Sequence, residues 1–191
     1  MKTTILLIIF FCLSVSLQAQ FLREGNSFGI TFSGLGHHDA FTFSFVPKIG
    51  EKPDGFIGLG HYSFGITYIQ PLSNRFDWEI GVEYSRSKIR FYSISESIPN
   101  HDFHLSLIRV PVTFRFNFWQ YFFLNGGFFG GINLRAESVN NRWDRGIILG
   151  VGARYDFKNM PVGLFINPYL NNRAMYGMLE AGFRVGVVYN F

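Results

Sequence analysis

The chain has few charged residues and almost no cysteine. Charged residues make up 16% of its 191 residues, aromatic residues make up 19%, and the single cysteine is Cys12. The charged fraction lies well below the roughly one quarter typical of soluble domains, and disordered chains need the opposite balance. Because Cys12 lies in a segment that we expect to be removed, the mature chain would have no disulfide, thiolate metal site or cysteine nucleophile.

The chain also lacks a run of basic residues. Its formal net charge is +4, which falls to about +3 if Lys2 is removed (4 − 1). Without clustered Lys and Arg there is no electrostatic footprint for nucleic acid, so we expect no nucleic-acid partner.

Long apolar runs are equally absent. The longest, from Ile5 to Val15, is shorter than the roughly 18 residues that a transmembrane anchor needs. It follows the positive charge of Lys2 and ends near the small residue Ala19, which is the pattern of a signal peptide. We therefore expect a signal peptide over 1–19 and one domain over 20–191.

Beyond the signal, apolar residues recur at every second position over segments of roughly 8 to 14 residues, which is the period of a β-strand. In the last segment one face runs from Leu179 to Phe191, while the other carries Glu180 and Arg184. The pattern predicts strands over 27–33, 63–68, 76–85, 108–118, 122–135, 146–157, 162–166 and 179–191.

The polar faces of these strands distinguish two kinds of β-protein. A soluble sandwich turns its polar faces to bulk water, where Lys, Glu and Thr are common. Here those faces hold Gly, Ser, Asn and paired Arg and Glu, which suits a cramped lumen. Only a closed barrel satisfies every backbone group of such strands in lipid. The sequence therefore predicts an all-β, antiparallel, up-and-down transmembrane β-barrel in the outer membrane of a Gram-negative bacterium.

The connections predict the orientation of the barrel. Short turns fall at 71–74, 119–120 and 158–161, and longer polar links at 36–60, 95–103, 136–145 and 171–177. Short periplasmic turns and long outer loops are typical of outer-membrane barrels. Aromatic residues then gather at the periplasmic end, namely Trp78, Phe118, Trp119, Tyr121, Tyr155, Tyr189 and Phe191.

The number of strands follows from the number of alternating segments. Eight segments alternate clearly, and Phe41 to Phe45 is a ninth candidate. Because single-chain bacterial barrels have an even number of strands, we interpret this run as a strand extension or hairpin in the first loop. Ten strands is the alternative.

Two consecutive segments carry a family resemblance. Ile108-Arg-Val-Pro-Val-Thr-Phe-Arg-Phe-Asn-Phe118 leads into a glycine-rich strand from Tyr121 to Leu134. With 146–157 and the terminal strand, they resemble the PorT-like outer-membrane β-barrel domain family, in which a strand of the type IPxxxxYxF precedes a glycine-rich strand. Val187 stands where that family usually has glycine. The resemblance implies a barrel, and the family's named members act in secretion across the outer membrane. No catalytic residue can be carried over from it.

Charged residues at inward positions balance in number. There are five acids, Asp77, Glu79, Glu83, Asp156 and Glu180, and five arginines, Arg109, Arg115, Arg135, Arg154 and Arg184. We expect Glu79 beside Arg115 and Arg154, and Glu83 beside Arg109 and Arg184. One interpretation is a charge-lined channel or proton relay. We favour a structural network that fills the lumen, since an eight-stranded barrel is only wide enough for its own side chains.

Two His-x-Ser steps raise an enzymatic alternative. His61-Tyr62-Ser63 is similar to the His-Tyr-Ser of outer-membrane lipid A deacylases, in which the pair faces lipid late in the chain beside an orienting Glu. Here the phase of the strand points His61 inward. His104 and Ser106 share the lipid-facing phase but have no evident carboxylate beyond Asp102 or Glu96. A lipid A-modifying hydrolase therefore stays an alternative, as does a narrow porin, and we expect no enzyme.

The remaining features concern ligands and partners. All histidines map to the outer half of the barrel, but their spacing matches no ligand motif, so we expect no metal and no cofactor: His37, His38, His61, His101 and His104. A stripe of Phe41, Phe43 and Phe45 above the membrane would form an apolar patch for a protein partner. The other expected partners are outer-membrane lipid, lipopolysaccharide and the barrel-assembly machinery.

Overall fold

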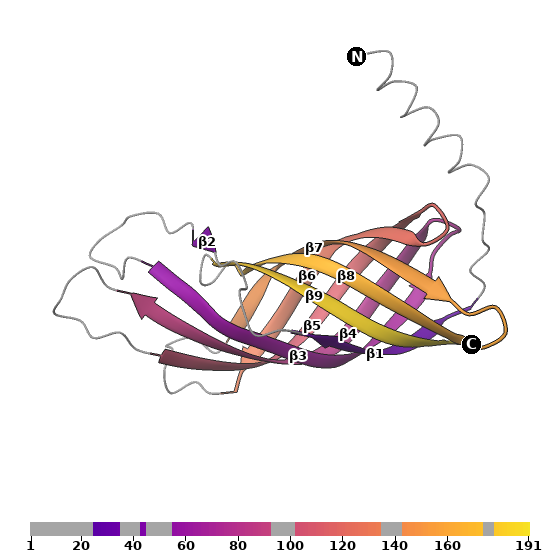
Figure 1. Ribbon diagram of the computed structural model, residues 1–191. Coiled ribbons are helices and arrows are strands. Elements are labelled where there is room, and N and C mark those ends of the chain that lie inside the picture. The colour runs from indigo at the N-terminus through magenta and orange to yellow at the C-terminus, as the bar shows by residue number, and fades with distance from the viewer. Residues whose placement is uncertain (1–24, 35–42, 45–54, 93–101, 135–142, 174–177) are drawn as a thin grey trace, which may run out of the picture.

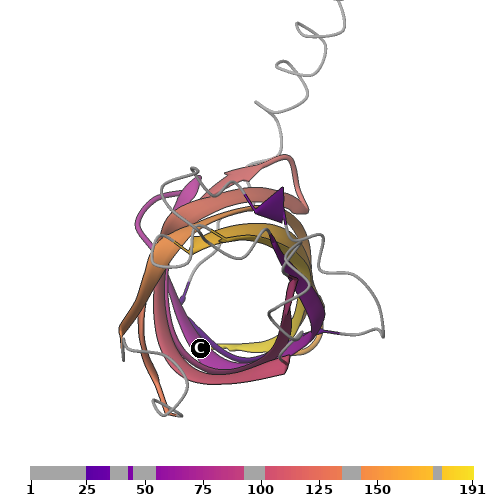
Figure 2. The same ribbon diagram turned by 90° about the vertical axis from the view of Figure 1, so that its left-hand side faces the viewer.

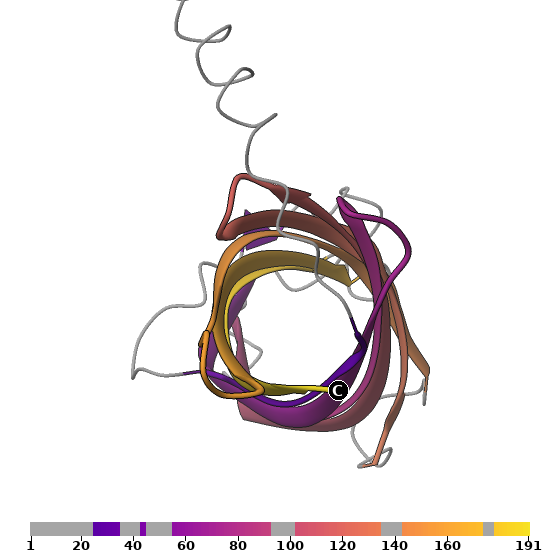
Figure 3. The same cartoon turned by 90° about the vertical axis from the view of Figure 1, so that its right-hand side faces the viewer.

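Eight antiparallel strands close on themselves in this computed structural model, which describes residues 25–34, 43–44, 55–92, 102–134, 143–173 and 178–191 (Figure 1). Each strand pairs with the next, and the last returns to the first, so the ribbons form a ring when seen along the axis (Figures 2 and 3). The strands are β1 (Ser27–Ser33), β3 (Gly55–Pro71), β4 (Phe76–Tyr92), β5 (Asp102–Phe118), β6 (Phe122–Asn133), β7 (Trp143–Asp156), β8 (Val162–Arg173) and β9 (Met178–Asn190). Closure leaves no long unpaired edge, and the predicted eight-stranded barrel is confirmed.

A ninth, very short strand lies outside this ring. β2 (Phe43–Ser44) pairs antiparallel with Leu179 and Met178 of β9, beyond the end of β1. The run from Phe41 to Phe45 thus contributes a two-residue extension of the sheet rather than an additional barrel strand. Residues 41, 42 and 45 lie outside the described part of the chain.

The two faces of the sheet have opposite chemistry. Along β1 the side chains alternate strictly between buried and exposed, and the outward residue Ile30 is 66% exposed. Inward positions include charged residues that are almost inaccessible, such as Arg115 at 0% and Glu79 at 2%. A soluble sandwich would bury its apolar face instead. No helix among the residues described is long and apolar enough to cross a membrane.

The two ends of the barrel differ. At one end, which we call the turn end, β3–β4, β5–β6 and β7–β8 are joined by 72–75, 119–121 and 157–161, close to the C-terminus (Figure 1). These are the predicted short turns. The amide of Phe76 donates to Ser73 Oγ at 3.2 Å, and the ring centroids of Tyr121 and Tyr155 lie 5.8 Å apart. The opposite end, which carries the longer links, is the loop end.

Several strands are longer than the sequence pattern predicts. β3, β4 and β5 have 17 residues each. β3 includes part of the predicted loop 36–60, β5 includes part of the predicted loop 95–103, and β4 continues to Tyr92 rather than ending at 85. Along β4 the outward apolar residues end at Arg86, although the backbone pairing between β3 and β4 continues beyond it. β8 extends to Arg173 rather than 166. Polar residues and Pro168 obscure the apolar alternation of β8 in the sequence. Pairing between β7 and β8 is also interrupted near Pro168, between Gly150↔Tyr169 and Ala153↔Ile166.

Candidate functional site: the filled lumen

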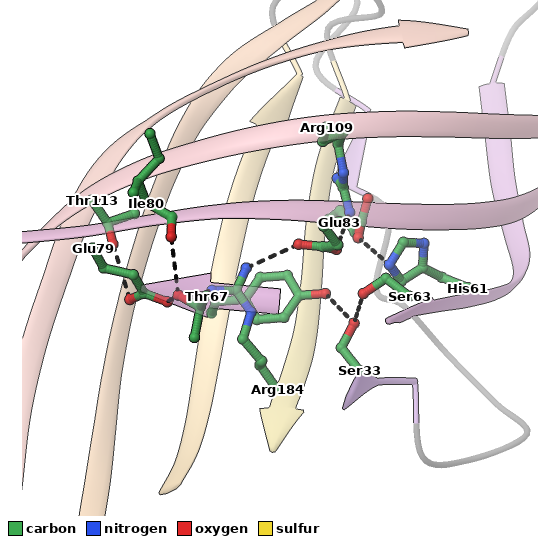
Figure 4. A network of polar contacts seen from close by, with 12 residues as sticks. Ser33, His61, Ser63, Thr67, Glu79, Ile80, Glu83, Arg109, Thr113 and Arg184 are labelled. Carbon is green, nitrogen blue, oxygen red and sulfur yellow. Dashed lines mark hydrogen bonds and ion pairs between the residues drawn. The ribbon is translucent and has the colours of Figure 1, made fainter. Parts of the chain in front are cut away.

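Buried ion pairs connect strands across the lumen. Arg115 of β5 lies 2.6 Å from Glu79 of β4, measured from Nη2 to Oε2. Nearer the loop end, Glu83 accepts from Arg109 at 2.7 Å and from Arg184 of β9 at 3.3 Å. The structure thus brings together five of the predicted inward charges, of which Glu79, Glu83, Arg109 and Arg184 are labelled in Figure 4. Arg184 also lies 3.9 Å from Glu79, which links the two levels.

Hydroxyl groups add further hydrogen bonds to the buried carboxylate of Glu79. Thr67 donates to Glu79 Oε1 at 2.7 Å, and Thr113 donates to Glu79 Oε2 at 3.2 Å. Ser33 hydrogen-bonds to Ser63 at 2.6 Å and to the phenol of Tyr169 at 3.2 Å (Figure 4). Burial of a charge is tolerated only where its hydrogen-bonding capacity is satisfied in this way.

Four aromatic rings also point into the lumen, a feature that the sequence analysis missed. Each is paired in register with a glycine of the following strand: Phe123↔Gly152, Phe129↔Gly146, Phe165↔Gly186 and Tyr169↔Gly182. A Cβ on Gly182 would lie 2.7 Å from the Tyr169 oxygen, and the other three glycines are equally close to their rings. These glycines therefore supply the space that the rings occupy.

Arginine side chains cover the same rings. The guanidinium carbon of Arg115 lies 4.6 Å from the centroid of Phe123 and 5.1 Å from that of Phe165. Arg109 lies 5.4 Å from the ring of Phe129, and Arg184 lies 5.5 Å from that of Tyr169. These distances are within the range of cation–π attraction. The lumen is thus built of repeated layers of glycine, aromatic ring, arginine and carboxylate.

A second cluster lies closer to the loop end. His61 shares a 2.8 Å hydrogen bond with Ser87 through Nδ1, and its Nε2 lies 3.2 Å from Glu180 Oε1. Arg173 Nη2 lies 2.8 Å from Glu180 Oε2, whereas its Nε is 3.9 Å from Asp144. The sequence pattern predicts that Asp144 and Arg173 lie in the loops 136–145 and 171–177. Both are 1% exposed and lie on strands. Their opposite charges are the only feature of the sequence that could have indicated that they lie close together.

Three further predicted inward residues, Arg154, Asp156 and Asp77, lie near the turn end. Arg154, which we expected beside Glu79, donates to Asp156 at 2.9 Å and to Asn190 at 2.6 Å. Asp77 accepts from Asn117 at 2.9 Å. Arg135 lies outside the described residues.

The His-x-Ser steps do not form nucleophile–base pairs in the structure. Ser63 bonds to Ser33, while His61 contacts Ser87. His104 is exposed, and Ser106 shares its outward phase, since the register sets it opposite the outward residue Arg86, but Ser106 is only 5% exposed. The order Ser87, His61, Glu180 is that of a hydrolase triad. Glu180 is also paired with Arg173, and all three side chains are enclosed. Within the described ranges, no group of three His, Cys, Asp or Glu residues is placed to hold a metal ion.

The fold matches small outer-membrane barrels of known structure. The chain is similar to the outer membrane protein OprG from Pseudomonas aeruginosa, with a TM-score of 0.55 at 9% identity, over 91% of this chain and 99% of that one. It is also similar to the Yersinia pestis outer membrane protein Ail, with a TM-score of 0.44 at 16% identity, over 88% of this chain and 100% of that one. No protein-family model and no curated protein matches the sequence. The likeness to OprG shows a shared fold.

Proposed function

We propose that the protein is a non-enzymatic integral protein of the Gram-negative outer membrane with a side-chain-filled lumen. Residues 1–19 would direct export, and the barrel-assembly machinery would insert the rest. One observation carries this proposal: a closed barrel exposes apolar side chains outward and buries paired charges inward. Only lipid around the barrel makes that inversion stable.

The filled lumen favours a structural role over conduction. Arg115 and Glu79 are buried and paired, and the buried rings of Phe123 and Phe165 pack against the Arg115 guanidinium. Removing one partner of a buried pair costs about 3–5 kcal/mol, because the other charge is left buried and uncompensated, so the folded barrel depends on keeping both partners. A pore would instead need charged rings around open space.

The functional contacts would then be made by the outer loops. Loops on a rigid scaffold commonly carry binding function, and β2 shows that the first loop can add backbone pairing to β9. An extended partner segment can bind to a sheet in the same manner. The PorT-like resemblance supports a partner in protein secretion across the outer membrane, and we include that link in the proposal.

Four measurements test the proposal. Cell fractionation should find the protein in the outer membrane, and the purified protein should migrate differently in electrophoresis before and after heating, as folded barrels do. Crosslinking in intact cells should capture a protein neighbour through 40–46. A soluble protein in the periplasm, or a refolded protein that conducts in the nanosiemens range in planar bilayers, would contradict it.

A further inference from the structure

Basic side chains gather on the outward face of the barrel near the loop end. In β4 the odd-numbered residues from Asp77 to Ser87 are buried, so the even-numbered ones face outward. From Phe76 to Tyr84 these outward positions carry no charge, and the next two are Arg86 and Lys88.

Neighbouring strands extend this basic group. The register places Lys88 opposite His104 of β5, and Arg86 opposite Tyr62 of β3. Directly opposed residues in antiparallel strands have Cβ atoms roughly 4.5–5.5 Å apart. Tyr62 and His104 are exposed, and Arg86 and Lys88 are partly exposed. We call Tyr62, Arg86, Lys88 and His104 the basic patch.

The patch lies at the height expected for a membrane surface. Arg86 follows Phe76, at the turn end of β4, by ten residues (86 − 76). At about 3.4 Å per residue and a strand tilt of about 40°, ten residues rise about 26 Å along the barrel axis, close to the roughly 25 Å height of the apolar band. Arg145 of β7 precedes Tyr155 by the same interval and is exposed. Lipid-facing cations are tolerated at this boundary but not at the bilayer midplane.

The charge of the patch has one sign. Among the described outward side chains of β3, β4 and β5, none is a carboxylate. Arg86 and Lys88 thus bring two positive charges to the outward face at this boundary, where lipid headgroups lie.

We propose that the basic patch binds the phosphate groups of lipid A in the outer leaflet. This inference rests on the proposed outer-membrane location and adds a lipid-binding site to it. The guanidinium of Arg86 can donate two parallel hydrogen bonds to a phosphate, and the ammonium of Lys88 supplies a compact charge. Tyr62 has an apolar ring and a polar tip, which suits the lipid–headgroup interface.

The test uses the full-length mature protein, folded in detergent, titrated calorimetrically with bis-phosphorylated lipid A and with phosphate-free lipid A. The wild type should bind the phosphorylated form more tightly. The variant Arg86→Gln/Lys88→Gln should lose about 25-fold in affinity, since each basic residue near an anionic lipid surface contributes about five-fold. The charge-preserving variant Arg86→Lys/Lys88→Arg should retain most of the affinity.

A matched control separates this site from general charge attraction. Arg75→Gln/Lys158→Gln makes the same charge change at exposed positions of the turn end and should leave affinity unchanged. Equal binding of the two lipids, or an equal loss in the control and patch variants, overturns the proposal. Heat-modifiable migration is measured first for every variant: a wild type that forms no barrel contradicts the proposed function, whereas a folded wild type without phosphate preference contradicts the lipid site alone.

Discussion

Tyr169 of β8 fills the space left by Gly182 of β9. A Cβ on this glycine would approach the tyrosine oxygen to 2.7 Å, and the tyrosine is held in place by Ser33 and by the guanidinium of Arg184. The glycine-rich inner face and the aromatic rings therefore form one packing arrangement.

The first prediction concerns this arrangement. Gly182→Ala should lower the free energy of unfolding by about 1–3 kcal/mol, because an added methyl group in a packed interior forces neighbours out of place. Urea unfolding of the barrel in lipid or detergent measures this. Gly130→Ala is the control, since no atom lies within 4 Å of its Cβ position, and its stability should match the wild type. Equal effects of the two changes would contradict the packing role.

The second prediction concerns the Glu79–Arg115 pair. Glu79→Ala should cost about 3–5 kcal/mol, because it leaves the guanidinium of Arg115 buried without its carboxylate. A double-mutant cycle with Arg115→Ala should show strong coupling between the two positions. Additive losses would show that the two side chains act independently.

The third prediction compares two carboxylates of the loop-end cluster. Glu180→Gln should destabilise the barrel more than Asp144→Asn, because Arg173 lies 2.8 Å from Glu180 but 3.9 Å from Asp144, and electrostatic attraction weakens with distance. Unfolding curves of the two variants under identical conditions give the order directly. A larger loss for Asp144→Asn would reverse the assignment of the principal partner of Arg173.

The fourth prediction concerns conduction. Wild-type protein in planar bilayers should show no nanosiemens steps, since the lumen of an eight-stranded barrel is filled by its own side chains. Truncating Phe123 and Phe165 to Ala together should increase ion leakage, because these rings and Arg115 pack together near the turn end. Folding of the double variant is checked by heat-modifiable migration. Leakage that stays unchanged in a folded variant would place the barrier elsewhere.

The fifth prediction concerns catalysis. Overexpression should leave the lipid A mass spectrum unchanged, and Ser87→Ala should alter stability without altering any lipid product. Ser87 and its partner His61 are enclosed in the lumen, and the carboxylate of Glu180 is shared with Arg173. A lipid A species that appears with the wild type and disappears with Ser87→Ala would establish a hydrolase.

The sequence by itself determined the barrel, its short turns and the direction of most side chains. Alternation is a local property: in a strand, successive residues point to opposite faces, so the lipid-facing set from Phe28 to Phe191 can be read without knowing which strands meet. The pairing of Glu83 with Arg109 was accessible for the same reason, because the two strands are consecutive and joined by one loop.

Only the tertiary structure decided how the lumen is filled. Arg173, Asp144 and Glu180 come from three strands, and their meeting depends on register and closure, which local alternation does not encode. The same holds for Phe165 over Gly186 and for Arg154, whose partners near the C-terminus are set by the return of β9 to β1. The inward aromatic residues pack against glycines of the neighbouring strands, and which glycine each one meets is set by strand register.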